Sequence, residues 1–418
     1  MFRFTQKSST SFLSAAIGRV TLALFLVVCG ANAAFAQFRA YVGNARENTV
    51  SVIDTATNTV IATVPVGNAP LAVAVTPDGA FAYVANSVDA TVSVIEAATN
   101  TVTATVQVGL RPAAVAVMPN GAFAYVVNEN SDSISVIDTA TNTVTATVPV
   151  GNAPRGVAIT PNGAFAYVAN FSAGTVSVID TATNTVSATI PVAVGLTSIA
   201  VTPNGAFAYV ARSAASVSVI DTVTNTVIAS IPLPHTARVI DITPDGALAY
   251  VGSFQSFISV IDTATNTVSA TLPIAGSAGV AVRPDGAFAY VTSSLTNIVQ
   301  VIDTATNTVT ATINVGDGPI GIAFPTRRPV DPIGSLITEI LALVANGTLT
   351  QDQGNGLIDK LEQIVAKLDA DRTGAACNQL DAFISQVNAF INSGALAPGQ
   401  GQPLINAVNA IKTNLGCQ

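Results

Sequence analysis

The sequence has no tryptophan and a single histidine, and only 10% of its residues are charged, where about a quarter is usual. So little charge excludes a disordered chain held open by its own charges. One histidine excludes a zinc site built from several histidines. No Walker-type phosphate loop and no G-x-S-x-G nucleophile elbow occurs, so the motifs of those two enzyme classes are absent.

Basic residues are scarce, and the net charge is −8. The lysines all lie outside the repeats described below, at Lys7, Lys360, Lys367 and Lys412. An acidic surface repels phosphate backbones, so no nucleic-acid partner is expected.

The N-terminus has the pattern of a secretory signal. Basic residues precede an apolar run at Val20–Val28, and the small residues of Ala34–Ala36 follow. We therefore expect a signal peptide over 1–36, cleaved after Ala36, and a secreted, periplasmic or cell-surface protein without a transmembrane segment in its mature chain. The alternative is a lipid anchor on Cys29, within Leu26–Cys29. Cleavage after Ala36 leaves 13 basic and 24 acidic groups.

Cleavage also leaves two cysteines, Cys377 and Cys417. Two thiols in an exported chain favour one disulfide, with two unpaired thiols as the alternative.

One sequence motif recurs seven times. The marker "IDTATNTV" places its acidic residue every 41 or 42 residues, at Asp54, Glu96, Asp138, Asp180, Asp221, Asp262 and Asp303. The chain's seven tyrosines share that period: Tyr41, Tyr83, Tyr125, Tyr167, Tyr209, Tyr250 and Tyr290. A fixed period near 40 indicates a solenoid, a propeller or an array of repeats.

Each period divides into four short strands. In the repeat these strands read "PLAVAVT" (A), "AFAYVAN" (B), "TVSVI" (C) and "TVTATVPVG" (D), separated by the turn "PDG", a variable loop and an acidic turn of the "DTATN" type. The late proline of D fits only a sheet edge. Four antiparallel strands per period are typical of a propeller blade.

The two ends of the repeat region predict a closed ring. The first copy lacks strand A, and the last copy ends with an unmatched A strand at Pro319–Pro325. Together they complete a seventh blade and hide the open sheet edges. The expected fold is therefore an all-β, seven-bladed propeller over 37–326; an open β-solenoid is the alternative.

The words "AYVAN…TVSVIDTATNTVTATVPVGNAP…GVAITPNGAF" resemble the YVTN-family β-propeller repeat of secreted and surface-layer-like proteins, over about residues 38–326. The resemblance implies a seven-bladed propeller outside the cytoplasm. It implies no single activity, because similar propellers include lactonases, quinoprotein subunits and nucleic-acid binders. Without tryptophan, the tryptophan-stapled quinoprotein type is not expected.

Beyond Pro325–Pro332 the apolar period becomes helical. We expect a linker at 327–332 and a four-helix module at 333–418, with helices from Pro332 towards Gly347 and at about 350–370, 375–392 and 399–414. Cys377 begins the third helix and Cys417 follows the fourth, so antiparallel packing would join them. The segment resembles the FIMAH-type helical module of exported multidomain proteins.

Function is sought where the copies differ. The B–C and D–A loops vary most and lie on one face, around the mouth of the central channel. Blades three to six gather six polar residues there that the other copies lack: Arg111, Arg155, Arg212, His235, Arg238 and Asp241. They predict a pocket for an anion or carboxylate. The alternative is a solvated rim whose arginines pair with Glu129, Asp132 or Asp241.

The sequence favours a non-catalytic, monomeric binding propeller whose surface ligand or protein partner is unknown. The alternative is a lactonase-like hydrolase using Arg155, His235, Arg238 and Asp241, favoured if these side chains converge within about 5 Å. No cofactor and no metal is expected. The segment Asp369–Gly374 starts like a calcium loop, but Leu380 stands where the bidentate glutamate belongs.

Overall fold

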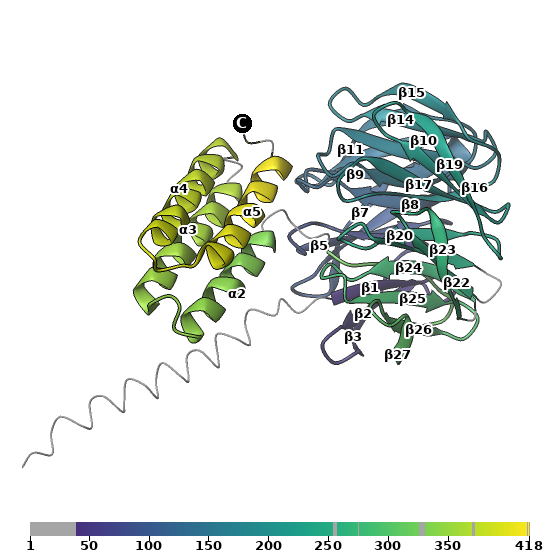
Figure 1. The fold of residues 1–418 in the computed structure, drawn as a ribbon. Helices are drawn as coiled ribbons and strands as arrows, with labels where there is room; N and C mark the ends of the chain where they lie inside the picture. Colours follow the sequence, from purple (N-terminus) through teal and green to yellow (C-terminus); the bar gives the residue numbers. More distant parts are fainter. Residues whose placement is uncertain are drawn as a thin grey trace, which may run out of the picture.

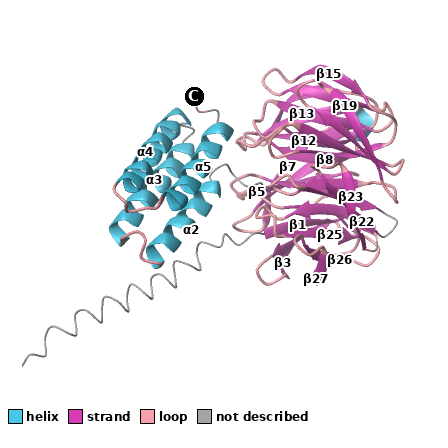
Figure 2. Cartoon of the chain, viewed as in Figure 1, coloured by secondary structure: helices cyan, strands magenta, loops and turns pink. Residues whose placement is uncertain are grey.

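The computed structural model describes residues 39–253, 257–274, 276–325, 331–369, 373–415 and 417. Its strands form seven four-stranded antiparallel sheets, and four helices form a separate bundle (Figures 1 and 2). The expected all-β, seven-bladed propeller with a small helical part is therefore confirmed. The expected signal segment at 1–36 and most of the expected linker at 327–332 lie outside the described residues.

Each sheet runs from an inner strand A to an outer strand D, and the A strands contact one another around the axis. The A strands are β28 (Pro319–Ala323), β4 (Pro70–Val75), β8 (Pro112–Val117), β12 (Pro154–Ile159), β16 (Leu196–Val201), β20 (Val239–Ile242) and β24 (Ser277–Val282), for blades 1 to 7 in order. The B strands are β1 (Arg39–Asn44), β5 (Phe81–Asn86), β9 (Phe123–Asn128), β13 (Phe165–Asn170), β17 (Phe207–Arg212), β21 (Leu248–Ser253) and β25 (Phe288–Ser293).

The outer half of each blade continues in the same order. The C strands are β2 (Thr49–Asp54), β6 (Thr91–Glu96), β10 (Ser133–Asp138), β14 (Thr175–Asp180), β18 (Ser216–Asp221), β22 (Phe257–Asp262) and β26 (Ile298–Asp303). The D strands are β3 (Thr59–Pro65), β7 (Thr101–Gln107), β11 (Thr143–Pro149), β15 (Thr185–Pro191), β19 (Thr226–Pro232), β23 (Thr267–Pro273) and β27 (Thr308–Asn314). Five of these seven outer strands have proline as their seventh and last residue. Proline is tolerated there because the D strand is the edge of its sheet and pairs with strand C alone.

The ring is closed by pairing the two ends of the repeat region. Strand β28 lies antiparallel to β1, with Tyr41 opposite Ala323 and Val42 opposite Ile322. Blade 1 therefore takes its inner strand from the end of the propeller and its other three strands from the start, as the split copy predicts.

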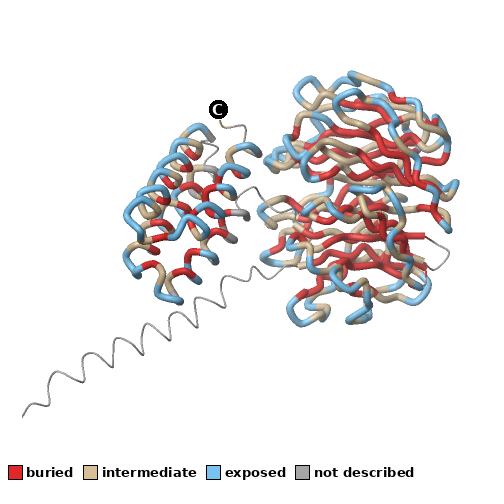
Figure 3. The backbone as a smooth tube through the Cα atoms, in the orientation of Figure 1, coloured by how far each residue is buried: buried red, intermediate tan, exposed pale blue. Residues whose placement is uncertain are grey.

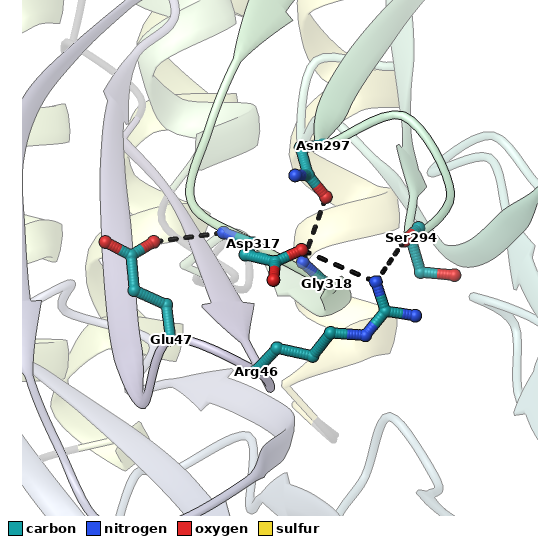
Figure 4. Close-up of polar contacts among 6 residues, drawn as sticks. All are labelled: Arg46, Glu47, Ser294, Asn297, Asp317 and Gly318. Carbon is teal, nitrogen blue, oxygen red and sulfur yellow. Dashed lines mark hydrogen bonds and ion pairs between the residues drawn. The ribbon is translucent and has the colours of Figure 1, made fainter.

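Polar contacts reinforce this junction (Figure 4). Arg46 Nη1 lies 3.4 Å from Asp317 Oδ1, and the Asp317 amide donates to Glu47 Oε2 at 3.0 Å. The next amide, that of Gly318, donates to Asn297 Oδ1 at 3.1 Å. The Arg46–Asp317 and Glu47–Asp317 contacts join residues 271 and 270 positions apart in the chain, so they act only in the closed ring.

Buried residues run along the strands of the propeller (Figure 3), and their apolar side chains cluster between successive blades. One cluster, for example, combines Val92 and Val94 of blade 2 with Val117, Ala124 and Val126 of blade 3. Blade after blade, the same Val and Ala positions of one sheet meet those of the next. Because a single blade cannot cover both of its own faces, each copy depends on its neighbours.

The buried tyrosines tie each blade to the next. Tyr125 donates to Asn184 Oδ1 at 2.7 Å, in the acidic turn of the following blade, and burial raises the pKa of Tyr125 to about 12. Six such bonds exist, at 2.7–2.9 Å: Tyr83–Asn142, Tyr125–Asn184, Tyr167–Asn225, Tyr209–Asn266, Tyr250–Asn307 and Tyr290–Asn58. The seventh pair, Tyr41 and Asn100, is not bonded. There, Arg39 replaces the usual Phe or Leu and donates to the Ala97 carbonyl at 2.6 Å.

The helical part consists of α2 (Asp331–Ala345), α3 (Gln351–Asp369), α4 (Thr373–Asn392) and α5 (Pro398–Asn414). Its own core includes Leu361, Phe383 and Val408. Cys377 of α4 and Cys417 beyond α5 form the predicted disulfide, with Cα atoms 5.6 Å apart. No helix in the described part of the chain has the length and apolar character needed to cross a membrane.

Candidate functional site

The B–C and D–A loops together form one face of the propeller, which we call the loop face. In blades 1 to 4, strand B ends there in a buried asparagine. In blade 2, Asn86 Nδ2 donates to Thr91 Oγ1 at 3.1 Å and to Ser93 Oγ at 2.9 Å, which fixes the B–C connection. A Cβ added at Gly67 would lie 2.7 Å from Asn86 Cγ, so the D–A loop needs glycine at that position. The four matched pairs are Asn44–Gly316, Asn86–Gly67, Asn128–Gly109 and Asn170–Gly151.

Blade 5 changes both members of this pair. Ala193 stands at the glycine position and Arg212 at the asparagine position. Arg212 Nη1 donates to Ser216 Oγ at 3.2 Å, while its Nε is buried without a hydrogen-bond partner. Arg212 therefore takes over the bond that asparagine makes to strand C elsewhere, and this bond lies within its own blade.

Glu129 is the centre of a charged cluster that joins two of the predicted residues, Arg111 and Arg155. It starts the short 3₁₀ helix η1 (Glu129–Ser131) in the B–C loop of blade 3, and its side chain is only 6% exposed. Its Oε1 lies 2.9 Å from Arg155 Nε and 3.2 Å from Arg111 Nη1. Two arginines of neighbouring blades thus share one buried carboxylate, and this group of three carries a net positive charge.

The Arg155 guanidinium is held on two sides. Glu129 fixes its Nε, and the ring of Phe171 lies under its plane, with the guanidinium carbon 3.6 Å from the ring centre. The Arg155 side chain is 34% exposed, and its two terminal nitrogens bond to no residue in the described part of the chain. The arginine therefore presents a fixed, planar pair of donors at the inner edge of the loop face.

Arg238 occupies the position in blade 6 that Arg155 occupies in blade 4. Burial lowers the pKa of Arg238 to about 10, and the positive charge of Arg155 adds to this effect. The two arginines stand at matching positions on either side of blade 5. Between them lies Thr197, whose hydroxyl lies within hydrogen-bonding distance of the Ala211 and Ala237 carbonyls.

His235 and Asp241 do not join the Glu129 cluster. The His235 ring stacks in parallel on Phe257, with 4.0 Å between ring centres. Asp241 lies on inner strand β20, where the other six blades have alanine. Its carboxylate accepts from the Val282 amide of β24 at 2.8 Å and from the Ile242 amide at 2.9 Å, so it bridges two inner strands. Burial raises the pKa of Asp241 to about 6, against the lowering effect of those two bonds.

His235 and Asp241 make separate contacts in this arrangement. Among the described residues, His235 and Asp241 share no hydrogen bond, so they do not form a base with an orienting carboxylate. Nor does that part of the chain bring together three or more His, Cys, Asp or Glu side chains that could hold a metal ion.

Phe171 and Phe257 are the contributors that sequence reasoning missed. Both lie in or beside the variable B–C loops, and Phe171 is the only aromatic residue in the B–C loops of blades 1 to 4. This difference between copies is the sequence feature that could have identified Phe171 as a site residue. Its meaning depends on the arginine placed above the ring, which the sequence does not show.

Comparison with known proteins supports the propeller fold. The family model described as "Lactonase, 7-bladed beta-propeller" matches residues 49–189, about a third of the chain. Among curated proteins, none is detectably similar in sequence.

Solved structures supply the remaining likenesses. Hydrazine synthase of Kuenenia stuttgartiensis is 25% identical with a TM-score of 0.60, over 63% of this chain and 92% of that one. A functionally unknown protein from Desulfotomaculum acetoxidans DSM 771 is 20% identical with a TM-score of 0.60, over 69% of this chain and 99% of that one. The dihydro-haem d1 dehydrogenase NirN is 17% identical with a TM-score of 0.50, over 68% of this chain and 74% of that one. The chain is therefore a seven-bladed propeller, and part of it is similar to lactonase propellers.

Proposed function

We propose that this protein is an exported, non-catalytic binding propeller of the YVTN-repeat type, and that its loop face binds the carboxylate of a surface ligand or protein at Arg155. The observation that carries the proposal is the Arg155 side chain, held by Glu129 and Phe171 with both terminal nitrogens lacking a described partner.

The chemistry of guanidinium fits this role. Its two terminal N–H groups form a planar fork that matches a carboxylate or phosphate bidentately. Because Glu129 and Phe171 already fix the plane, little side-chain entropy remains to be lost on binding. Arg111 and Arg238 add positive potential, in a protein whose net charge is −8.

Export is supported by the signal-like residues 1–36 and by the Cys377–Cys417 disulfide, since disulfides persist outside the cytoplasm. On this proposal the mature chain acts as a monomer, the helical module resembles the FIMAH type, and the binding surface faces the periplasm or the medium.

Titration calorimetry with acetate, succinate and benzoate at constant ionic strength tests the proposal. Wild-type protein should bind at least one of these carboxylates, and Arg155→Ala should weaken that binding roughly 10- to 100-fold, since a charge-assisted bond contributes about 1.5–3 kcal/mol. Arg155→Lys should also bind weakly, because an ammonium lacks the fork.

Arg46→Ala is the matched control. Arg46 lies on the same face, 60% exposed and paired with Asp317, so its removal changes net charge equally. If Arg46→Ala weakens binding as much as Arg155→Ala, or if no carboxylate binds, the proposal is wrong.

The match of residues 49–189 to lactonase propellers favours one competing function, a lactonase-like hydrolase. In that role Arg155 and Arg238 would polarise the lactone carbonyl, and His235 or Asp241 would activate water. Lactone opening above the uncatalysed rate, abolished by His235→Ala or Asp241→Ala, would establish it in place of simple binding.

A further inference from the structure

We infer that the carboxylate recognised at Arg155 carries an apolar chain, so that the ligand class is an amphiphilic carboxylate and not a small hydrophilic anion. This inference rests on the proposed function, and it depends on two exposed apolar side chains, Leu110 and Val194.

Leu110 lies beside the Glu129 cluster on its blade 3 side. It directly precedes Arg111, and the Asn130 amide donates to the Leu110 carbonyl at 3.2 Å, which places this loop against η1. The Leu110 side chain is 61% exposed. An apolar side chain is thus held next to one of the two arginines that share Glu129.

Val194 lies on the opposite side, in the loop that enters blade 5. The next residue, Gly195, donates its amide to the Phe171 carbonyl at 2.8 Å, so Val194 is anchored to the residue whose ring supports Arg155. Its side chain is 66% exposed. Leu110 and Val194 therefore flank Arg155 along the rim, one from each neighbouring blade.

The same loop position is polar and bonded in three other blades. Asn68 donates to Asp89 through both its amide and its side chain, Asn152 donates to Asp132, and Asp317 pairs with Arg46. Beside Arg155 this position is Leu110 in one loop and Val194 in the other; the Leu110 amide still donates to Ser131 Oγ at 2.8 Å, but both apolar side chains are exposed. Single exposed apolar residues are common on protein surfaces; what points to a ligand here is that both flank the same cation.

The physical consequence is a dependence of affinity on chain length. A site that contacts only the carboxylate group binds acetate and octanoate with equal affinity. Apolar contacts at Leu110, Val194 and the Phe171 ring edge should add about two- to fourfold in affinity per methylene that they cover. An anionic membrane is disfavoured as the occupant, because Glu47, Asp89, Asp132 and Asp317 lie on the same face.

Calorimetric titration of the purified protein with acetate, butanoate, hexanoate and octanoate measures this dependence. Affinity should rise about two- to fourfold per added methylene until the apolar contacts are filled. The double variant Leu110→Ser/Val194→Ser should flatten this rise while leaving acetate binding as in wild type. Leu295→Ser is the matched control, since Leu295 is an apolar residue 68% exposed on the loop face of blade 7, and it should keep the rise.

The outcomes separate this inference from the proposed function. Equal affinity across the series, still lost in Arg155→Ala, overturns the apolar chain and leaves the anion site standing. A rise lost equally in Leu295→Ser, or co-sedimentation with phosphatidylglycerol vesicles without binding of any monomeric carboxylate, also overturns it. Failure of every carboxylate to bind removes both proposals.

Discussion

Asparagine and glycine constrain each other on the loop face of this propeller. Gly109 touches Asn128 so closely that an added Cβ would lie 2.6 Å from its Cγ, and the same pair recurs in blades 1 to 4. Where the asparagine becomes Arg212, the glycine becomes Ala193. The asparagine side chain therefore leaves room only for glycine at the paired position, and in blade 5 both positions carry other residues.

The tyrosine–asparagine bonds provide a prediction with an internal control. Tyr125→Phe leaves Asn184 Oδ1 without its donor and should lower the free energy of unfolding by about 1–2 kcal/mol. Tyr41→Phe should change it far less, because the Tyr41 hydroxyl makes no bond to Asn100. Urea unfolding of the two variants measures the difference. Equal losses would show that these bonds do not hold the blades together.

Asp241 predicts an unusual pH dependence. Its carboxyl has a pKa near 3.8 when unfolded and about 6 when folded, so between these values the folded state keeps a proton that the unfolded state has lost. Its contribution therefore falls as pH rises from about 4 to about 6, by up to roughly 3 kcal/mol, and stays low above that range.

The comparison variant is Asp241→Ala, which restores the residue of the other six blades. Urea midpoints across this pH range should show wild type losing stability relative to Asp241→Ala as pH rises. Two curves that stay parallel would mean that Asp241 is not buried as described. Carboxylates with lowered pKa, such as Asp138, affect both proteins alike and cancel.

At the residue scale, the sequence shows which residues recur in every blade. It does not show which of the non-recurring residues contact each other across two blades. The repeated Tyr and the Asn of the acidic turns were recognisable as scaffold because every blade has them. The sharing of Glu129 by Arg111 and Arg155 depends on η1, a helical turn that no other B–C loop forms among the described residues. Sequence reasoning named the correct acid only as one of three candidates.

At the scale of elements, turn chemistry set the strand ends. The Asp of the acidic turn accepts backbone amides, as Asp138 does from Ala140 and Thr141 at 3.0 and 2.9 Å, and its Asn adopts positive φ, as at Asn142. These signals recur in each copy, so the strands were predictable to within a residue or two. Strand β20 is the exception at four residues, because its loop carries Pro234 and His235 in place of Gly and Asn.

The disulfide between α4 and the segment after α5 gives a prediction at this scale. It closes a sequence separation of 40 residues, so the double variant Cys377→Ser/Cys417→Ser should destabilise the helical bundle by about 3–4 kcal/mol. Thermal unfolding followed by far-UV circular dichroism should show an earlier helical transition with the propeller transition unchanged. An equal shift of both transitions would contradict the separate core of the bundle.

At the scale of the whole molecule, the ring and its loops follow different rules. Ring closure could be predicted, since the missing first A strand and the extra last one have no other use in a compact fold. The arrangement of the loop face could not, because Arg155 reaches Glu129 only when blades 3 and 4 are side by side, and the Val194 loop reaches Phe171 only when blades 4 and 5 are. The blades are nearly identical, but the loops of blades 3 to 5 differ from the rest, and we propose that the ligand binds at these loops.

A crystal structure of the protein soaked with octanoate tests this assignment most directly. The account predicts a carboxylate within hydrogen-bonding distance of both Arg155 terminal nitrogens, with its chain running towards Leu110 or Val194. An Arg155 whose terminal nitrogens are occupied by protein groups, or a carboxylate bound instead at Arg46 or elsewhere, would contradict it.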